Sequence, residues 1–249
     1  MNQHEITEAA RLLVKARREG ALLAELPVKP ATVADAHAIQ DAVTAELNEK
    51  VGAFKANAPP NEEPTRGVIY ARTIHPSPAR IPATEVPLCG VEAEVAFRFR
   101  RDLPTRPEPY TREEVAAAVD ACAAIEVITS RFRDQAKRGT LEKLADCVSN
   151  GGFVHAAPET DWQHLDLPDI HVRLAVNGHT QVDQQGGHPT NDPLGVAVAL
   201  VNMLRADRGV SAGQFVTCGS YTGMRFLKPG DTCAVDFAGL GAAEVTFTT

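Results

Sequence analysis

The chain has 249 residues, a formal net charge of −7 and 44% hydrophobic residues, so it can bury a substantial core and lacks the basic surface typical of nucleic-acid binders. Its five widely spaced cysteines, without a Cys-x-x-Cys pair, predict neither a disulfide framework nor a zinc site. Because no apolar run is long enough to span a membrane, we expect a cytoplasmic protein without membrane or nucleic-acid partners.

Two amphipathic helices are predicted at the start of the chain. Residues 6–18 and 32–50 place apolar side chains at helical spacing with charged residues between them. Thr32, followed three residues later by Asp35, is typical of a capping box. The second helix is therefore expected to begin there.

A lysine interrupts the next predicted strand. Residues 51–58 form an apolar run around Lys55 and end at two prolines. A lysine in such a run usually extends its ammonium group to water. The alternative is a lysine that is held beside an anion or acts as an acid. The polar residues 61–66 follow as a loop, which is either a simple connection or a lid.

The strand predicted for residues 90–99 carries two carboxylates on one face. Polar and apolar residues alternate there, so Glu92 and Glu94 leave the same side of the strand. Their Cα atoms are expected about 6.7 Å apart, which is close enough for both side chains to bind one cation. A solvated strand face opposite an arginine or lysine is the alternative.

A helix and a buried strand are predicted next. Residues 111–124 show helical periodicity with acidic residues in the first turn. Residues 124–131 are rich in β-branched side chains around Glu126, which predicts a buried strand. An ionised carboxylate in that environment needs a partner. That partner is either a cation or, in the structural alternative, Arg131 or Arg133.

The second half of the chain alternates short strands with turns. One longer helix is predicted for residues 193–204, with a proline in its first turn. Further strands are predicted for residues 67–71, 80–81, 170–176, 179–182, 215–218, 232–237 and 243–247, and a short helix for residues 141–148.

Two glycine-containing turns are candidate substrate contacts. The first contains Asn150 and Gly151, whose backbone amides can face a ligand. The second contains Ser220 and Thr222, whose hydroxyls and backbone N–H groups suit a carboxylate. Taken alone, the second turn is more simply explained as a Gly-bounded connection between strands.

Glu92, Glu94 and Glu126 together make an all-oxygen site without nearby Cys or His ligands. Hard divalent cations prefer such sites, so Mg2+ or Mn2+ is expected rather than Zn2+. A 2-oxo acid would offer the cation its carboxylate and ketone oxygens, and the cation would stabilise the enolate through which such acids react. Lys55 is placed to transfer a proton or to neutralise the substrate carboxylate.

Two strand motifs carry a family resemblance, Val91–Phe97 and Ile125–Arg131. Together with the later segments, they resemble the 2-keto-4-pentenoate hydratase and 4-oxalocrotonate decarboxylase group of the fumarylacetoacetate hydrolase superfamily. The likeness covers nearly the whole chain from about Gly52. The later matching segments are Asp146–Val154, Asn177–Gly178, Pro193–Leu194, Gly219–Gly223, Pro229–Asp231 and Gly239–Gly241.

The resemblance implies an α+β fold, with a mixed strand-rich β-roll behind the N-terminal helices. We expect a helical segment over residues 1–50 and a catalytic β-rich domain over residues 51–249, joined as one structural unit. The family is Mg2+- or Mn2+-dependent, usually homo-oligomeric, and works in the degradation of aromatic compounds. By its match, Lys55 is the active-site lysine, and Ser220 and Thr222 belong to the substrate-binding turn.

The implied activity is that of a lyase. Our first hypothesis is hydration of 2-hydroxy-2,4-dienoates to 4-hydroxy-2-oxo acids. The alternatives are a 4-oxalocrotonate-type decarboxylase or a C–C hydrolase of the same superfamily. A non-catalytic subunit that binds small acids, or that pairs with a related decarboxylase or hydratase, is the alternative from another class.

Three segments depart from the family pattern. Ala56–Pro59 replaces a Gly-Leu-Thr-Ser-like turn, Thr129 stands where many members have Asp, and Ser149–Gly151 replaces a more usual Ser-Ser-Gly. These segments are expected to border the substrate, so the departures concern specificity more than the metal chemistry.

Overall fold

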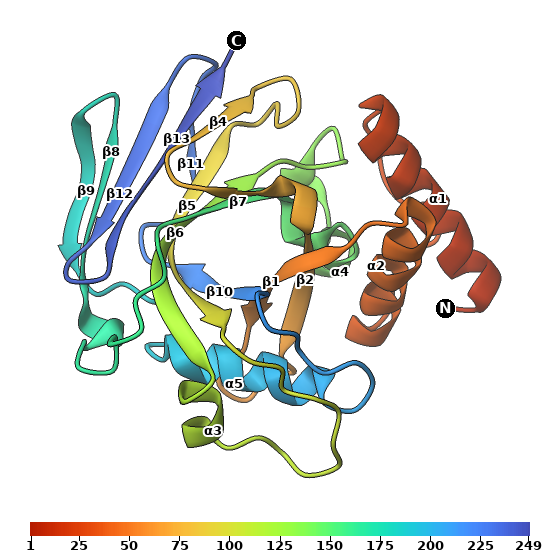
Figure 1. Ribbon diagram of the computed structural model, residues 1–249. Helices are drawn as coiled ribbons and strands as arrows, with labels where there is room; N and C mark the ends of the chain where they lie inside the picture. Colours follow the sequence, from red (N-terminus) through yellow and green to blue (C-terminus); the bar gives the residue numbers. More distant parts are fainter.

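The computed structural model describes residues 1–249, and two β-sheets form its centre (Figure 1). The strands of the larger sheet are β1 (Val51–Asn57), β2 (Thr65–Tyr70), β3 (Ile74–Pro76), β5 (Gly90–Phe99), β6 (Val119–Ile128), β7 (Asn150–His155), β10 (Phe215–Ser220) and β11 (Arg225–Phe226). Their order is β2-β1-β10-β5-β6-β7-β3, with β11 paired to β5. Because β2 also contacts β7, the sheet curls into a roll, and Figure 1 looks along its interior.

The smaller sheet covers one side of this roll. Its strands are β4 (Ala79–Pro82), β8 (His171–Val176), β9 (His179–Gln185), β12 (Thr232–Phe237) and β13 (Gly241–Thr248), in the order β4-β13-β12-β8-β9. Strands β12 and β13 contact β6, so β6 lies between the roll interior and the second sheet. All ten residues of β6 are buried. The predicted α+β class with a mixed, strand-rich roll is confirmed.

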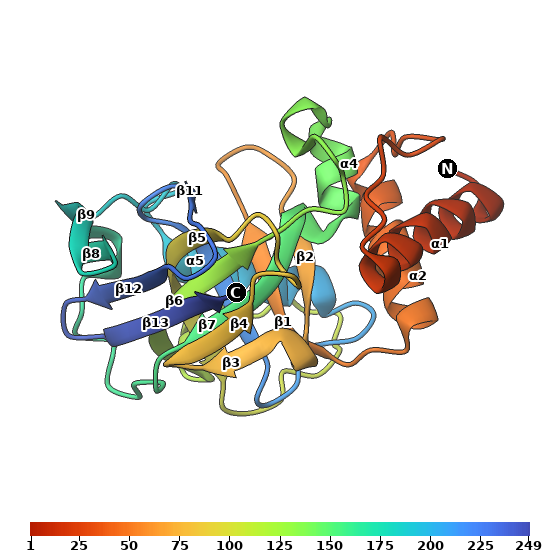
Figure 2. The same ribbon diagram turned by 90° about the horizontal axis from the view of Figure 1, so that it is seen from above.

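Helices lie outside the sheets. They are α1 (Gln3–Glu19), α2 (Val33–Leu47), α3 (Arg112–Ala116), α4 (Thr140–Ala145) and α5 (Pro193–Leu204), with short 3-10 turns at Ala71–Thr73, Gln135–Lys137, Cys147–Ser149 and Leu167–Asp169. Helices α1 and α2 pack side by side on the side of the roll opposite β8 and β9 (Figures 1 and 2). The predicted bounds of α5 and the capping box of Thr32 and Asp35 are both confirmed.

The N-terminal helices are tied to the roll by burial and by hydrogen bonds. They share a cluster of 11 buried apolar residues that includes Phe132 and Leu144 from the later chain. Gln40, which is fully buried on α2, donates to the carbonyl oxygens of Arg66 and Leu144, and it accepts from the backbone N–H of Val68.

The helix predicted over residues 111–124 is wrong beyond its first turns. Thr111 caps α3 as expected, but the helix ends at Ala116 and β6 begins at Val119. The alanine-rich sequence favours a helix locally. In the folded chain β6 instead pairs with β5 over ten residues, from Val119 opposite Phe99 to Ile128 opposite Gly90. This pairing and the burial of both faces override the local propensity.

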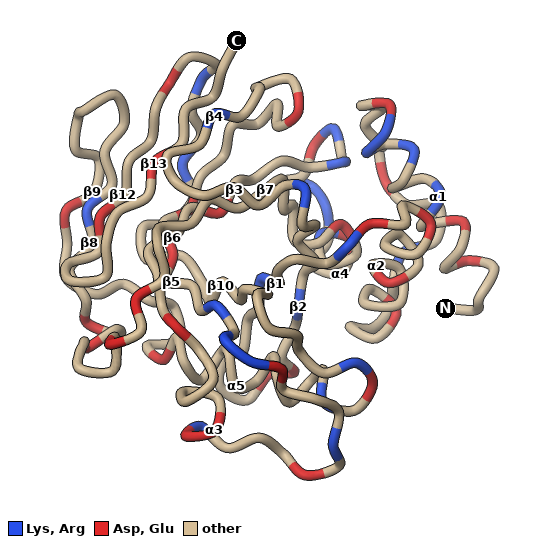
Figure 3. Tube along the Cα trace, in the orientation of Figure 1, with Lys and Arg blue, Asp and Glu red and all other residues tan.

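Charged residues of both signs are interspersed along the trace (Figure 3). None of the helices combines the length and the apolar character that crossing a bilayer requires. All five cysteines are buried and unpaired, as small apolar residues of the core.

Candidate functional site

Strands β5 and β6 bring three carboxylates together inside the roll. Glu92 and Glu94 leave the same face of β5, as the alternation predicts, and Glu126 stands directly opposite Glu92 in the antiparallel pair. One oxygen from each of the three side chains lies within 4.8 Å of the others. Glu94 and Glu126 are buried and Glu92 is half-buried.

Lys55 reaches this group from β1. Its Nζ lies 2.7 Å from Glu126 Oε1, and only 15% of its side chain is exposed. The same ammonium donates a hydrogen bond of 3.4 Å to the carbonyl oxygen of Val148. The interpretation in which Lys55 extends its ammonium group to water is therefore wrong. The structure holds this ammonium group beside the carboxylate of Glu126.

Neither candidate arginine pairs with Glu126. The guanidinium of Arg131 binds the buried carboxylate of Asp146 instead. Arg133 points its Nε at the carbonyl oxygen of Leu22, 3.1 Å away. The arginine-paired alternative for Glu126 is therefore wrong, because both guanidinium groups lie on the loop that turns back toward the N-terminal helices.

Burial works against the negative charge of the group. It raises the pKa of Glu94 to about 8, and the charges of Glu126 and Glu92 contribute to the rise. Burial likewise raises the pKa of Glu92. For Lys55, burial favours the neutral form, but the charges of Glu126, Glu92 and Glu94 outweigh it and raise the pKa of the ammonium. Three carboxyl groups therefore crowd one ammonium group, and burial disfavours ionising all three without a further positive charge.

One carboxylate oxygen is left without a partner. Glu126 Oε1 accepts from Lys55 and, at 2.9 Å, from the side-chain amide of Asn150. Glu126 Oε2 is buried and has no hydrogen-bond partner. An unsatisfied buried oxygen within a group of three carboxyl side chains needs an explanation. A hard divalent cation fits this donor set, because carboxylate oxygens are the ligands that it prefers.

Two residues hold Glu94 in place: Gly219, from the predicted Gly219–Gly223 turn, and Thr217, which the sequence did not indicate. Thr217 donates its hydroxyl hydrogen, and Gly219 its backbone N–H at 2.6 Å, to Glu94 Oε2. Both residues lie on β10, which pairs with β5. The one local signal was a hydroxyl-bearing residue in the apolar run that begins at Phe215.

The predicted turn around Asn150 is partly wrong. The turn itself is Cys147–Ser149, and Asn150 opens strand β7. Asn150 meets the site through its side-chain amide, because β7 pairs with β6. Gly151 faces Thr129, since an added Cβ would lie 2.8 Å from the methyl carbon of that residue.

The second predicted turn contributes one free hydroxyl beside the carboxylates. Ser220 stands opposite Glu94 in the strand pairing, and its buried Oγ has no hydrogen-bond partner. Thr222 is engaged with the backbone, because its Oγ1 accepts from the N–H of Ala93 at 3.4 Å and donates to the carbonyl of Gly223.

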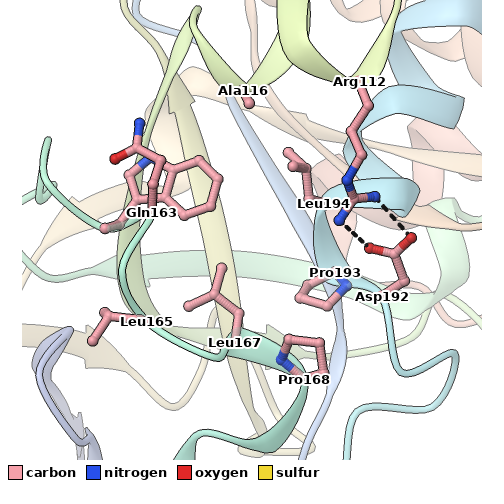
Figure 4. Close-up of a pocket in the computed structure, with 10 residues that line it drawn as sticks. Arg112, Ala116, Gln163, Leu165, Leu167, Pro168, Asp192, Pro193 and Leu194 are labelled. Carbon is pink, nitrogen blue, oxygen red and sulfur yellow. Dashed lines mark hydrogen bonds and ion pairs between the residues drawn. The ribbon is translucent and has the colours of Figure 1, made fainter.

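A separate cavity of about 250 Å3 lies away from these residues, between α3, the start of α5 and residues 162–168 (Figure 4). Arg112 and Asp192 join across its edge through two hydrogen bonds of 2.9 Å. Because Arg112 and Asp192 bind each other and the other walls are largely apolar, this cavity has no ligand set for a cation. The group formed by Glu92, Glu94 and Glu126 is therefore the candidate site.

Comparisons with known proteins identify sequence relatives and a solved structure with the same fold. The chain is 29% identical over 188 residues to a 2-keto-4-pentenoate hydratase of Burkholderia vietnamiensis, covering 75% of this chain and 71% of the relative. It is 28% identical over 262 residues to the 2-keto-4-pentenoate hydratase of Paraburkholderia xenovorans, covering 99% and 96%. The structure of 4-oxalocrotonate decarboxylase from Pseudomonas putida G7, complexed with magnesium and adipate, superposes with a TM-score of 0.81 at 20% identity, covering 99% and 98%.

The family assignment follows from the sequence match itself. A family model described as fumarylacetoacetate (FAA) hydrolase C-terminal matches residues 37–248, which is most of the chain and includes every candidate residue named above. The chain therefore belongs to the fumarylacetoacetate hydrolase family.

Proposed function

We propose that this protein is a divalent-metal-dependent hydratase that converts 2-hydroxy-2,4-dienoates into 4-hydroxy-2-oxo acids. The observation that carries the proposal is the convergence of Glu92, Glu94 and Glu126 beside the ammonium group of Lys55. Hydratase relatives aligned over almost the whole chain support the same reaction. Magnesium in the decarboxylase structure supports Mg2+ or Mn2+ as the cation.

The three glutamates are proposed to hold the cation, with the unpartnered Glu126 Oε2 as one ligand. When bound, the cation would supply positive charge for the substrate carboxylate and for negative charge that develops on the 2-oxygen. Thr217 and the backbone of Gly219 orient Glu94 through their hydrogen bonds. Ser220 offers its free hydroxyl to the substrate from the opposite strand.

Lys55 is proposed to carry the proton that ketonisation of the dienoate requires. Its ammonium has three N–H groups. One is directed at Glu126 and one at the carbonyl oxygen of Val148, which leaves the third for the substrate. Protonation of the terminal carbon of the dienoate, with loss of the 2-hydroxyl proton to solvent, yields a conjugated 2-oxo acid, to which water then adds at the fourth carbon.

The test is turnover of freshly generated 2-hydroxypenta-2,4-dienoate, followed by ultraviolet absorbance with the product identified by NMR. We expect formation of 4-hydroxy-2-oxopentanoate that requires Mg2+ or Mn2+ and is abolished in Lys55→Ala. Glu92→Gln and Glu126→Gln should lose both turnover and Mn2+ binding measured by calorimetry. Glu244→Gln, at an exposed position on β13, is the matched control and should change neither.

Other outcomes identify the alternatives. CO2 release from 2-oxo-3-hexenedioate without hydration of the dienoate would replace the hydratase by a decarboxylase. Metal binding without turnover of either acid would favour a non-catalytic subunit. Unchanged Mn2+ affinity in both glutamate variants would overturn the metal site.

We further propose a cytoplasmic homo-oligomer. Five buried, unpaired cysteines support a reducing compartment. The exposed apolar side chains of Met224 and Phe226 support burial against a second copy.

A further inference from the structure

The segment that borders Lys55 has an unusual backbone. Cys147, Val148 and Ser149 have φ angles of 53°, 52° and 60°, so three successive residues other than glycine occupy the left-handed region. This conformation is uncommon for any such residue and is an outlier for a β-branched valine. Strain of this kind persists only where the surroundings hold it in place.

Arg131 spans this segment from one end to the other. Its Nη2 donates to the carbonyl oxygen of Asp146, and its Nη1 to the carbonyl oxygen of Asn150, both at 2.8 Å. Its Nε and its backbone N–H both donate to the carboxylate of Asp146. Arg131, a residue that is 5% exposed, therefore fixes the residues on both sides of the three strained ones through its guanidinium.

Two groups that this arrangement positions, one carbonyl oxygen and one side-chain amide, point into the candidate site. The carbonyl oxygen of Val148 accepts from Lys55 Nζ, and the side-chain amide of Asn150 donates to Glu126 Oε1. Movement of the segment would thus displace a partner of the lysine and a partner of the glutamate together. Neither Arg131 nor Asp146 touches the carboxylate group itself.

We propose that Arg131, paired with Asp146, is a positioning residue that holds the strained segment 147–149 and, through it, the relative placement of Lys55 and Glu126. The catalytic consequence rests on the proposed hydratase function, but the hold on the segment does not. The fork of a guanidinium is required, because a single ammonium group cannot reach both carbonyl oxygens and the carboxylate in this planar arrangement.

The chain offers a matched control. Arg17 also approaches Asp146, with its Nη2 at 3.5 Å from Oδ1, and its side chain is 11% exposed, but it comes from α1 and does not bind the carbonyl oxygens of Asp146 and Asn150 that Arg131 joins. Arg131→Lys and Arg17→Lys both keep a positive charge beside Asp146. We expect Arg131→Lys to lower kcat between about tenfold and 100-fold with KM changed by less than about threefold, and Arg17→Lys to keep kcat. Equal losses in the two variants, or full kcat in Arg131→Lys, would overturn the proposal.

Amide hydrogen exchange measures how firmly Arg131 holds residues 147–149, and this measurement does not depend on turnover of a substrate. Ser149 donates its N–H to the carbonyl of Asp146 at 3.1 Å, and Thr129 donates to the carbonyl of Ser149 at 2.9 Å. In the wild-type protein these amides should be protected, and peptides spanning residues 146–151 should exchange at least about tenfold faster in Arg131→Lys only. Unprotected amides in the wild type would overturn the proposal even if Arg131→Lys failed to fold. A wild type without turnover would remove the hydratase function and leave this exchange result to decide the positioning role.

Discussion

At the scale of single residues, Glu94 shows how the interior tolerates a carboxylate. Its Oε2 accepts two hydrogen bonds from β10, one from the hydroxyl of Thr217 and one from the N–H of Gly219. The hydroxyl bond lowers the pKa of Glu94, whereas burial and the neighbouring carboxylates raise it to about 8. Near neutral pH, a proton and a cation therefore compete for this side chain.

Replacing Thr217 by valine should shift that competition toward the proton. Without the hydroxyl bond, the pKa of Glu94 rises further, so we expect Mn2+ affinity at pH 7 to fall by about tenfold. The difference should narrow as the pH rises toward 9, because both proteins then lose the competing proton. Calorimetric titration at several pH values measures it. Thr246→Val, which removes a hydroxyl bonded to Thr232 in the smaller sheet, is the control, and equal affinities for all three proteins would contradict the role of Thr217.

At the scale of elements, the pairing of β1 with β2 sets how closely Lys55 approaches the strained segment. Gly67 stands opposite Lys55 in the register. A Cβ there would lie 2.8 Å from the carbonyl oxygen of Cys147 and 2.9 Å from Lys55 Cγ. The absence of a side chain at this position is thus what lets the lysine and the 147–149 backbone lie together.

The variant Gly67→Ala should therefore move Lys55 and the backbone of residues 147–149 apart. We expect a loss of about 1–3 kcal/mol in the free energy of unfolding, because the backbone on one side of the new methyl group cannot rotate away, together with a lower kcat. Urea unfolding and turnover measure the two effects. Gly139→Ala is the control, since its new Cβ would have only one neighbour within 4 Å, at 3.9 Å. A Gly67→Ala protein as stable as Gly139→Ala would show that β2 shifts freely.

At the scale of the whole molecule, we propose that residues 1–50 and residues 51–249 unfold as one unit. Gln40 is one buried polar link between them, with Nε2 at 2.9 Å from the carbonyl oxygen of Arg66 and Oε1 at 3.2 Å from the backbone N of Val68. The shared apolar cluster that includes Phe132 adds burial across the same boundary.

The variant Gln40→Leu tests this unity. It keeps the size of the side chain but leaves buried backbone groups of β2 and α4 without partners, so we expect a loss of roughly 2–5 kcal/mol. Calorimetry should show one transition shifted to lower temperature. Gln181→Leu, at an exposed position on β9, should leave the transition in place. Two transitions, of which only one moves, would mean that the helical segment unfolds independently.

The sequence by itself determined the features that depend on neighbours in the chain. Alternation placed Glu92 and Glu94 on one face of β5, and the Thr32 and Asp35 pair marked the start of α2. The order of motifs identified the family, which the match over residues 37–248 confirms. Such features are readable because side-chain periodicity and helix capping are set within a few residues.

Only the tertiary structure decided which side chains and which strands pair with one another. Glu126 meets Lys55 rather than Arg131, although 71 residues separate the lysine from the glutamate, because β1 and β6 face each other across the roll. Residues 119–124 form a strand rather than a helix because β5 pairs with them. Local propensities differ by about 1 kcal/mol or less per residue, so burial and strand pairing between distant segments outweigh them. The same long-range contacts bring Thr217 to Glu94, which no local pattern indicated, and they pair Arg131 with Asp146 rather than with Glu126.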